Sequence, residues 1–413
     1  MVTSPPPGGA RAVARCDALG VAPYSDRDDG LFRSWLSPAF AEAQQAVAQW
    51  MREAGMTVGT DAATNLVGRY EGSGDGPVLI IASHLDSVRD AGRYDGPLGI
   101  MLGIECVAAL NAEGRRLPFP IEVIAFGDEE GSRFPAAMLT SRAVAGRLTD
   151  TPAMTDGDGV SLADALAGFG TAPGRLAEAR HAPALAYLEA HIEQGPILEA
   201  DGLPLGIVTG IAAQRRLLFR LRGKAGHAGT TIMTLRRDAL AAAAEILLAV
   251  ERIGGERPDD LVATVGTIEA KPGAANVIPG EVAFSLDCRA LDPAVRDRAV
   301  DAILAEAGVI AERRGIGFEA EPIHDLPASP CDPRLMDLLA AAMTANGHPA
   351  RRLASGAGHD AMVMAALCPT AMLFIRCRDG ISHNPAEHVE PADADAALGV
   401  MLGFIERLGE EFA

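Results

Sequence analysis

The sequence has no run of about eighteen uninterrupted apolar residues, the length a membrane span needs. Basic residues are few, since 36 Lys and Arg face 55 Asp and Glu, and the resulting net charge of −19 argues against nucleic acid as a partner. None of the six cysteines forms a Cys-x-x-Cys pair, which suggests a reducing compartment, and we expect a cytoplasmic protein. The N-terminus has no apolar core of a secretory signal, and its Pro/Gly-rich start predicts a short disordered tail.

The composition that remains is that of a large globular protein. The chain has 413 residues, of which 48% are hydrophobic and only 4% aromatic. This length predicts two or three domains.

The order of the predicted elements indicates an α/β fold with a mixed central sheet flanked by helices. Apolar periodicity and continuous apolar runs predict strands and helices in βαβ order, and this character resumes after about residue 326. In the first part we expect a helix over 31–55, two short strands within 57–72, a buried strand over 77–83, a helix over 98–114 and a strand within 119–131.

Between these two parts the pattern changes to β-α-β-β-α, which is typical of a small α+β ferredoxin-like domain. We therefore predict a discontinuous domain of residues 1–210 and 326–413 with a second domain, 211–325, inserted into it.

Polar clusters follow the predicted buried strands, where open α/β sheets bind ligands. If those strands lie side by side, histidines and carboxylates converge in a set that suits zinc, manganese, cobalt or nickel. A carboxylate has two oxygens, so Asp95 could bridge two cations, and Asp86 could fix the tautomer of His84. The clusters are His84 with Asp86 and Asp95, then Asp128-Glu129-Glu130, then Glu189, His191, Glu193 and Gln194, and last His383.

The adjacent acids Glu129 and Glu130 suggest a division of labour, in which one binds metal and its neighbour takes a proton from water. Taken singly, each feature has a plainer interpretation. A lone buried histidine is usually a core residue, and acids after a strand usually form a solvated turn or a helix start. Four clusters at corresponding strand ends favour the metal site.

Several motifs together resemble one known family of metal-dependent amidohydrolases from about residue 30 to the C-terminus. The family comprises N-carbamoyl-L-amino acid hydrolases, β-ureidopropionases of the non-nitrilase type and allantoate amidohydrolases, within the superfamily of aminoacylases and carboxypeptidase G. The motifs are "SHLDSV", "GRYDGPLGI", "GDEEGSRF", "EAHIEQGPILE", "GKAGHAGTT", "NVIPGEV", "DCR", "SGAGHDA" and "GISHNPAEH".

The resemblance implies a catalytic domain with two divalent metal ions and an inserted lid or dimerisation domain. It places Asp95 as the bridge, with His84 and His191 on one ion and Glu130 and His383 on the other. Glu129 is implied as the general base, and His227 as a histidine from the partner subunit's lid that stabilises a developing oxyanion. The substrate-binding positions are Gln194, Asn276, Arg289 and Gly358, of which Arg289 would hold a carboxylate with its fork.

The expected assembly is an obligate homodimer through the lid domains, closing on the substrate before hydrolysis. The helix within 235–255 offers a small-residue surface and an apolar face for this contact, although one of its faces must pack on its own sheet. The two surfaces consist of Ala239, Ala242 and Ala243, and of Ile246, Leu247 and Val250.

The substrate expected first is allantoate, because Arg376-Cys377-Arg378 and "FGDEEGSRF" resemble allantoate amidohydrolases more than carbamoylases. The alternatives are N-carbamoyl-L-amino acids or β-ureidopropionate and, further off, N-acyl amino acids or dipeptides. The sequence departs from the family at Ile232, where a proline is usual. A non-catalytic binding protein on the same fold is a rival hypothesis, which the presence of Glu129 and all metal ligands disfavours.

Overall fold

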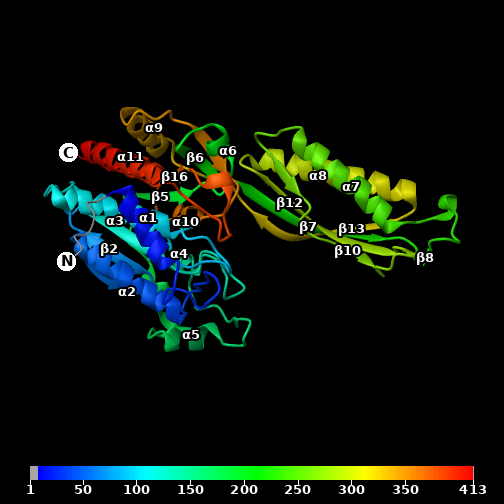
Figure 1. Cartoon of the computed structure of the whole chain (residues 1–413), viewed down its shortest axis with the longest axis horizontal. Coiled ribbons are helices and arrows are strands. Elements are labelled where there is room, and N and C mark those ends of the chain that lie inside the picture. Colours follow the sequence, from blue (N-terminus) through cyan, green and yellow to red (C-terminus); the bar gives the residue numbers. More distant parts are fainter. Residues whose placement is uncertain (1–7, 413) are drawn as a thin grey trace. The chain divides into compact units, whose positions relative to one another are not determined.

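The computed structural model describes residues 8–412 and divides into two compact units (Figure 1). Unit 1 runs to Thr209 and takes in Cys331–Leu353 and the chain from Gly358 on, whereas unit 2 consists of Gly210–Pro330 and Ala354–Ala357. The disordered tail expected at the N-terminus falls on residues 1–7, which are outside the described residues. Among the described helices, none combines the length and apolar character needed to span a membrane.

The helices and strands of both units are labelled in chain order. They are α1 (Gly9–Leu19), α2 (Pro38–Glu53), β1 (Thr57–Thr60), β2 (Leu66–Tyr70), β3 (Leu79–His84), α3 (Pro97–Ala112), β4 (Ile121–Phe126), α4 (Leu139–Val144), α5 (Leu162–Gly168), η1 (Pro173–Ala179), β5 (Ala186–Ile192), α6 (Ile197–Ala200), β6 (Leu205–Ile211), β7 (Ala213–Arg222), β8 (Gly226–His227), η2 (Met233–Leu235), α7 (Ala239–Gly255), β9 (Val262–Thr264), β10 (Ile268–Lys271), β11 (Val277–Ile278), β12 (Glu281–Ala290), α8 (Pro293–Arg314), β13 (Gly317–Leu326), β14 (Ser329–Pro330), α9 (Pro333–Ala345), β15 (Arg352–Ser355), α10 (Asp360–Met364), β16 (Thr370–Ile375), η3 (Arg378–Gly380) and α11 (Pro391–Glu410).

Unit 1 is built on a mixed sheet with the strand order β1-β2-β4-β3-β5-β16-β6. The four central strands, β4, β3, β5 and β16, run parallel, and β1, β2 and β6 pair antiparallel. Every residue of these four strands is buried, as continuous apolar runs predict for strands covered on both faces. The predicted fold class is confirmed, and the carboxyl ends of four strands meet at one edge.

Unit 2 has the element order β-α-β-β-α-β, given by β7, α7, β10, β12, α8 and β13, with the antiparallel sheet order β10-β12-β7-β13. Its core lies between this sheet and the two long helices. The surfaces of α7 expected to meet a second subunit are buried in that core, apart from Leu247, which is partly buried against it. Because α7 covers its own sheet with these rows, they do not supply a contact between subunits.

Two N-terminal elements differ from the sequence predictions. The helix predicted over 31–55 begins only at Pro38, where Ser37 caps it by accepting the amide of Phe40 at 3.1 Å. Proline suits the first helical position because its missing N–H would have no partner there. Helix α1 was not predicted, and it packs on α3 and α11, with Arg11 and Arg15 both paired to the buried Glu105.

Candidate metal centre

The predicted metal ligands of unit 1 converge at the carboxyl edge of the parallel strands. His84 is the last residue of β3, and His191 lies near the end of β5. Glu130 and His383 follow β4 and β16, while Asp95 lies in the loop that leads from β3 into α3. Parallel neighbours in the sheet thus bring together residues that are up to three hundred positions apart in the chain.

Two sets of three side chains share Asp95. Its Oδ1 lies 3.3 Å from His84 Nε2 and 3.2 Å from His191 Nε2, and those two nitrogens are 3.5 Å apart. Its Oδ2 lies 3.3 Å from His383 Nε2, which in turn is 3.3 Å from Glu130 Oε1. Each set has the ligand types and proximity that a metal ion requires.

The hydrogen bonds of the two buried histidines favour metal binding at Nε2. His84 Nδ1 lies 3.1 Å from the carbonyl oxygen of Asp86, and His191 Nδ1 lies 2.9 Å from that of Ile192. Because a carbonyl oxygen only accepts, both Nδ1 atoms carry the proton and both Nε2 atoms present lone pairs to Asp95 Oδ1. That oxygen is buried and has no hydrogen-bond partner among the described residues, so the site fits divalent cations.

Asp86 has a different set of contacts from the one expected. Its carboxylate oxygen is 3.6 Å from His84 Nδ1, so the histidine is oriented by the Asp86 main chain instead. The carboxylate accepts the main-chain amides of Glu129 and Glu130, each at 3.2 Å. Asp86 therefore fixes the backbone that carries both acids.

Glu129 is buried beside the candidate metal ligands and belongs to neither set around Asp95. With His84 and Glu130 it forms a further group that could hold a metal ion, in which one ligand atom of each residue lies within 4.8 Å of the others. Burial raises the pKa of the Glu129 carboxyl well above its usual range, and the neighbouring Glu130 adds to this effect. A carboxylate in such surroundings has an increased affinity for a proton.

The other members of the "EAHIEQGP" cluster have hydrogen-bond partners around the site. Glu193 accepts the amides of Ile197 and Leu198, at the start of α6. Gln194, expected to bind substrate, donates from Nε2 to Asp95 Oδ2 at 2.7 Å, and its Oε1 is buried with no hydrogen-bond partner among the described residues. Glu189 accepts hydrogen bonds from Ser83, Tyr187 and the amide of Ala361.

The "SGAGHDA" motif brings one further residue to the centre that the sequence did not single out. Its His359 is buried, and its ring lies edge-on to the ring of His191 with the centroids 4.5 Å apart. Gly358, expected to bind substrate, directly precedes it. His359 lies within a motif that resembles the family, but a single histidine after glycine does not indicate in the sequence that it packs against His191.

Unit 2 places His227 and Asn276 together but Arg289 far from them. His227 pairs with Val277 between β8 and β11, and the amide of Ala228 donates to the Asn276 carbonyl at 2.9 Å. This pair lies beyond the Glu281 end of β12, where Gly223 bonds to Gly280. Arg289 is eight residues further along β12, about 27 Å at roughly 3.4 Å per residue. No small ligand can touch both ends within one copy of unit 2.

Known proteins resemble this chain over most of its length. The model of peptidase family M20/M25/M40 matches residues 80–407. The chain is 43% identical to the N-carbamoyl-L-amino acid amidohydrolase of Geobacillus stearothermophilus over 372 residues, or 89% of this chain and 91% of that protein. It is 40% identical to the allantoate deiminase of Arabidopsis thaliana over 429 residues, or 96% of this chain and 81% of that protein. The solved structure of a hydantoinase/carbamoylase family amidase from Burkholderia ambifaria matches with a TM-score of 0.90 and 37% identity over 97% of each chain.

The chain belongs to the M20/M25/M40 family. The resemblance drawn from its motifs is thereby confirmed. It is an enzyme, a hydrolase.

Arg289 of this M20 family hydrolase lies in a network of charges on the sheet of unit 2. Its Nε and Nη2 donate to the two carboxylate oxygens of Asp287 at 2.8 and 2.9 Å, and Nη1 donates to the carbonyl of Gly356. Asp287 also accepts from Arg216 at 2.7 Å and from Gln214 at 2.8 Å. Asp287 therefore occupies the Nε–Nη2 edge of the Arg289 guanidinium, and only the Nη1–Nη2 edge is left for a ligand. Arg216 and Arg289 line a cavity of about 560 Å³.

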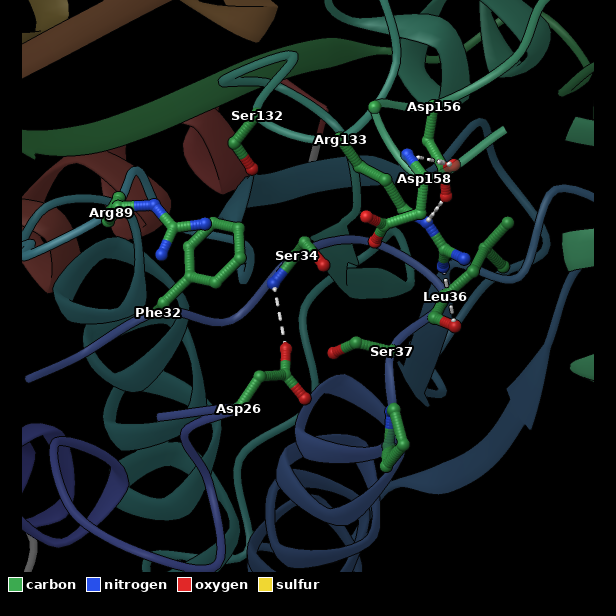
Figure 2. A pocket seen from close by; sticks show the side chains of 12 residues that line it. Asp26, Phe32, Ser34, Leu36, Ser37, Arg89, Ser132, Arg133, Asp156 and Asp158 are labelled. Atoms are coloured by element: carbon green, nitrogen blue, oxygen red, sulfur yellow. Dashed lines mark hydrogen bonds and ion pairs between the residues drawn. The ribbon is translucent and has the colours of Figure 1, made fainter. Parts of the chain in front are cut away.

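A second cavity, of about 510 Å³, lies in unit 1 and is lined by none of the candidate metal ligands (Figure 2). Arg133 in its wall is held by Asp156 and by the carbonyls of Trp35 and Leu36. The guanidinium of Arg89 lies over the ring of Phe32, 4.7 Å from its centroid. These contacts hold the side chains of the cavity wall in place.

Proposed function

We propose that this chain is a dinuclear-metal amidohydrolase that cleaves a linear ureido or carbamoyl C–N bond of a carboxylated substrate. Allantoate is the first candidate, and N-carbamoyl-L-amino acids or β-ureidopropionate are the alternative. Unit 1 is the catalytic domain, and unit 2 is the lid that also joins two subunits. The six cysteines are all free, which suits a cytoplasmic enzyme.

The observation that carries this proposal is the sharing of Asp95 between two ligand sets beside Glu129. His84 and His191 would hold one ion with Asp95 Oδ1, and Glu130 and His383 the other with Oδ2. When bound, the two cations would supply the Lewis acidity that polarises a substrate carbonyl and acidifies a water molecule. Zinc, manganese, cobalt and nickel all suit these ligands.

The protein groups then move the protons. Glu129 takes a proton from the water as the water oxygen bonds to the ureido carbon, and it returns a proton to the leaving nitrogen as the C–N bond breaks, which releases ammonia and leaves a carbamate. The carbamate then takes up a proton on its nitrogen and loses carbon dioxide, so the products are ammonia, carbon dioxide and the remaining amine. His227 of the partner subunit stabilises the negative charge that develops on the carbonyl oxygen, with Asn276 beside it.

A homodimer is proposed because one copy of unit 2 cannot bring His227 and Arg289 to the same substrate. Close to His227 in the chain, the segment that contains η2 carries three exposed apolar residues. The exposed fractions of Ile232, Met233 and Leu235 are 63%, 75% and 71%. Exposed apolar side chains next to a functional loop are typical of an interface. This loop replaces the surfaces of α7 as the expected contact.

Arg289→Lys is expected to lower kcat/KM about tenfold or more, because the ammonium cannot both bind Asp287 at two points and present an edge to a substrate carboxylate. Steady-state kinetics measure the loss, with Arg222→Lys as the control, since Arg222 forms an exposed pair with Glu319 on the same sheet. An equal loss with a substrate analogue that lacks the carboxylate would show that Arg289 is structural instead.

The choice of substrate rests on resemblance and not on a contact. Arg376, which favoured allantoate in the sequence, forms two hydrogen bonds with Asp393, and Arg378 pairs with Glu390. The test measures ammonia release from allantoate, N-carbamoyl-L-amino acids, an N-acyl amino acid and a dipeptide, with metal added. Turnover of only the last two would overturn the proposed function.

Removal of metal is expected to abolish hydrolysis and to lower stability. A ligand that binds only the folded state stabilises it by about 4 kcal/mol when the free ligand concentration is a thousand times the dissociation constant. Without metal, Asp95, Glu130 and Glu129 also repel one another. Dialysis against a chelator, followed by calorimetry and by assays after each divalent metal is restored, measures both effects. Full activity in a metal-free sample would contradict the prediction.

A further inference from the structure

Glu387 joins the two segments that carry Asp95 and His383. It belongs to the segment after β16, four residues beyond His383, yet its carboxylate reaches the loop before α3. Its Oε1 accepts the main-chain amides of Tyr94 at 2.8 Å and of Asp95 at 3.1 Å. Glu387 is 5% exposed, and no basic side chain within residues 8–412 forms an ion pair with it. Its partners are therefore those of a backbone clamp and not of a salt bridge.

Gly92 shows how closely the loop surrounds this carboxylate. A Cβ at position 92 would lie 2.2 Å from Glu387 Cδ and 2.4 Å from Glu387 Cβ, which is far inside van der Waals contact. The φ of Gly92 is not in the left-handed region, so the glycine is required by space and not by backbone conformation. The loop therefore leaves room for the Glu387 side chain only because position 92 has no side chain of its own.

The Asp95 side chain is held by a neighbour of the same carboxylate. Ser382 Oγ lies 3.2 Å from Glu387 Oε2 and donates its one proton to Asp95 Oδ2 in a short hydrogen bond. Glu387 therefore holds the main chain of Asp95 directly, and Ser382, in contact with Glu387, holds the Asp95 side chain. His383 follows Ser382 with a φ of 54°, a left-handed conformation that its surroundings must maintain.

We propose that Glu387 is a positioning residue that fixes Asp95 and His383 at metal-binding distance before a metal arrives. The inference rests on the proposed metal centre. Partners of metal ligands typically change metal affinity 10- to 100-fold when they are removed, because the ligands then lose their orientation. Glu387→Ala should therefore weaken binding of the ion held by Asp95 and His383 by at least about tenfold.

The test measures Zn²⁺ affinity of the metal-free full-length protein by competition with a chromogenic chelator. Glu387→Gln should stay within about threefold of the wild type, since its amide oxygen accepts from Tyr94 and Asp95 and its nitrogen can donate to Ser382. Glu390→Ala is the matched control, because Glu390 lies on the same segment but pairs with the exposed Arg378. Excess Zn²⁺ should restore turnover in Glu387→Ala.

A double-mutant cycle with Gly92 tests the clamp independently. Gly92→Ala alone should weaken Zn²⁺ binding, because its methyl group displaces the Glu387 side chain. Once Glu387→Ala has removed that side chain, Gly92→Ala should cost little more, so the two losses should not add. Additive losses would overturn the proposal.

The remaining outcomes separate the clamp from the metal centre itself. Wild-type Zn²⁺ affinity in a folded Glu387→Ala variant would refute the positioning role, and equal losses in the Ala and Gln variants would refute the hydrogen-bond basis. If Glu387→Ala does not fold, Glu387→Asp takes its place, because the shorter side chain cannot reach the loop amides. A wild-type protein that binds no Zn²⁺ would instead overturn the proposed function.

Discussion

Glu129→Gln is expected to lower turnover by about 10²- to 10⁴-fold while the protein keeps both metals. Glutamine has nearly the same shape, and its main-chain amide still donates to Asp86. It cannot take a proton from water, however, and Glu129 belongs to neither ligand set around Asp95. Turnover and metal content measured on the same sample give the result.

Glu130→Gln is the matched comparison, because it changes the adjacent acid in the same way. Glu130 lies 3.3 Å from His383 Nε2, so this variant should lose metal, and its activity should recover with excess metal. If Glu129→Gln lost metal and kept normal turnover per remaining ion, the two roles would be reversed or Glu129 would be only a ligand.

The sequence was informative wherever a residue lies on or directly after a buried parallel strand. β3 and β4 are recognisable from their apolar runs, and in parallel strands the carboxyl ends must share one edge. His84 and Glu130 could therefore be assigned to one site before any coordinates were known. The fold class followed from the same alternation of strands and helices.

Contacts between side chains and distant loops could not be predicted from the sequence. Nothing in the order of residues shows that Gln194 turns toward Asp95, or that Asp86 binds the amides of Glu129 and Glu130. Glu387 meets Tyr94 across 293 positions of the chain. Such contacts depend on how loops pack, which periodicity does not encode.

Two errors have a simpler physical origin. The apolar residues before Pro38 extended the periodic pattern of α2, but proline fixed the start of the helix at its own position. On α7, the regular rows of alanine and isoleucine resembled a contact surface, whereas a small domain needs them to fill its own core. Periodicity shows that a face is buried, and leaves open what covers it.

The geometry of unit 2 leads to the strongest test of assembly. His227 and Arg289 are separated by the length of β12, so a site that uses both must draw them from two copies of the chain. Separately, His227→Ala and Glu129→Gln should each be almost inactive. Mixed after subunit exchange, they should regain activity, because the His227→Ala subunit keeps Glu129 and receives His227 from its partner.

The expected recovery is up to about a quarter of wild-type activity, since half of the dimers are mixed and each has one working site of two. The measurement is ammonia release before and after exchange, with exchange followed by native mass spectrometry of isotope-labelled subunits. A mixture of His227→Ala with the double variant His227→Ala/Glu129→Gln is the control, and it should stay inactive because no subunit supplies the histidine. Failure of the first mixture to recover, with exchange complete, would mean that His227 does not act across the dimer.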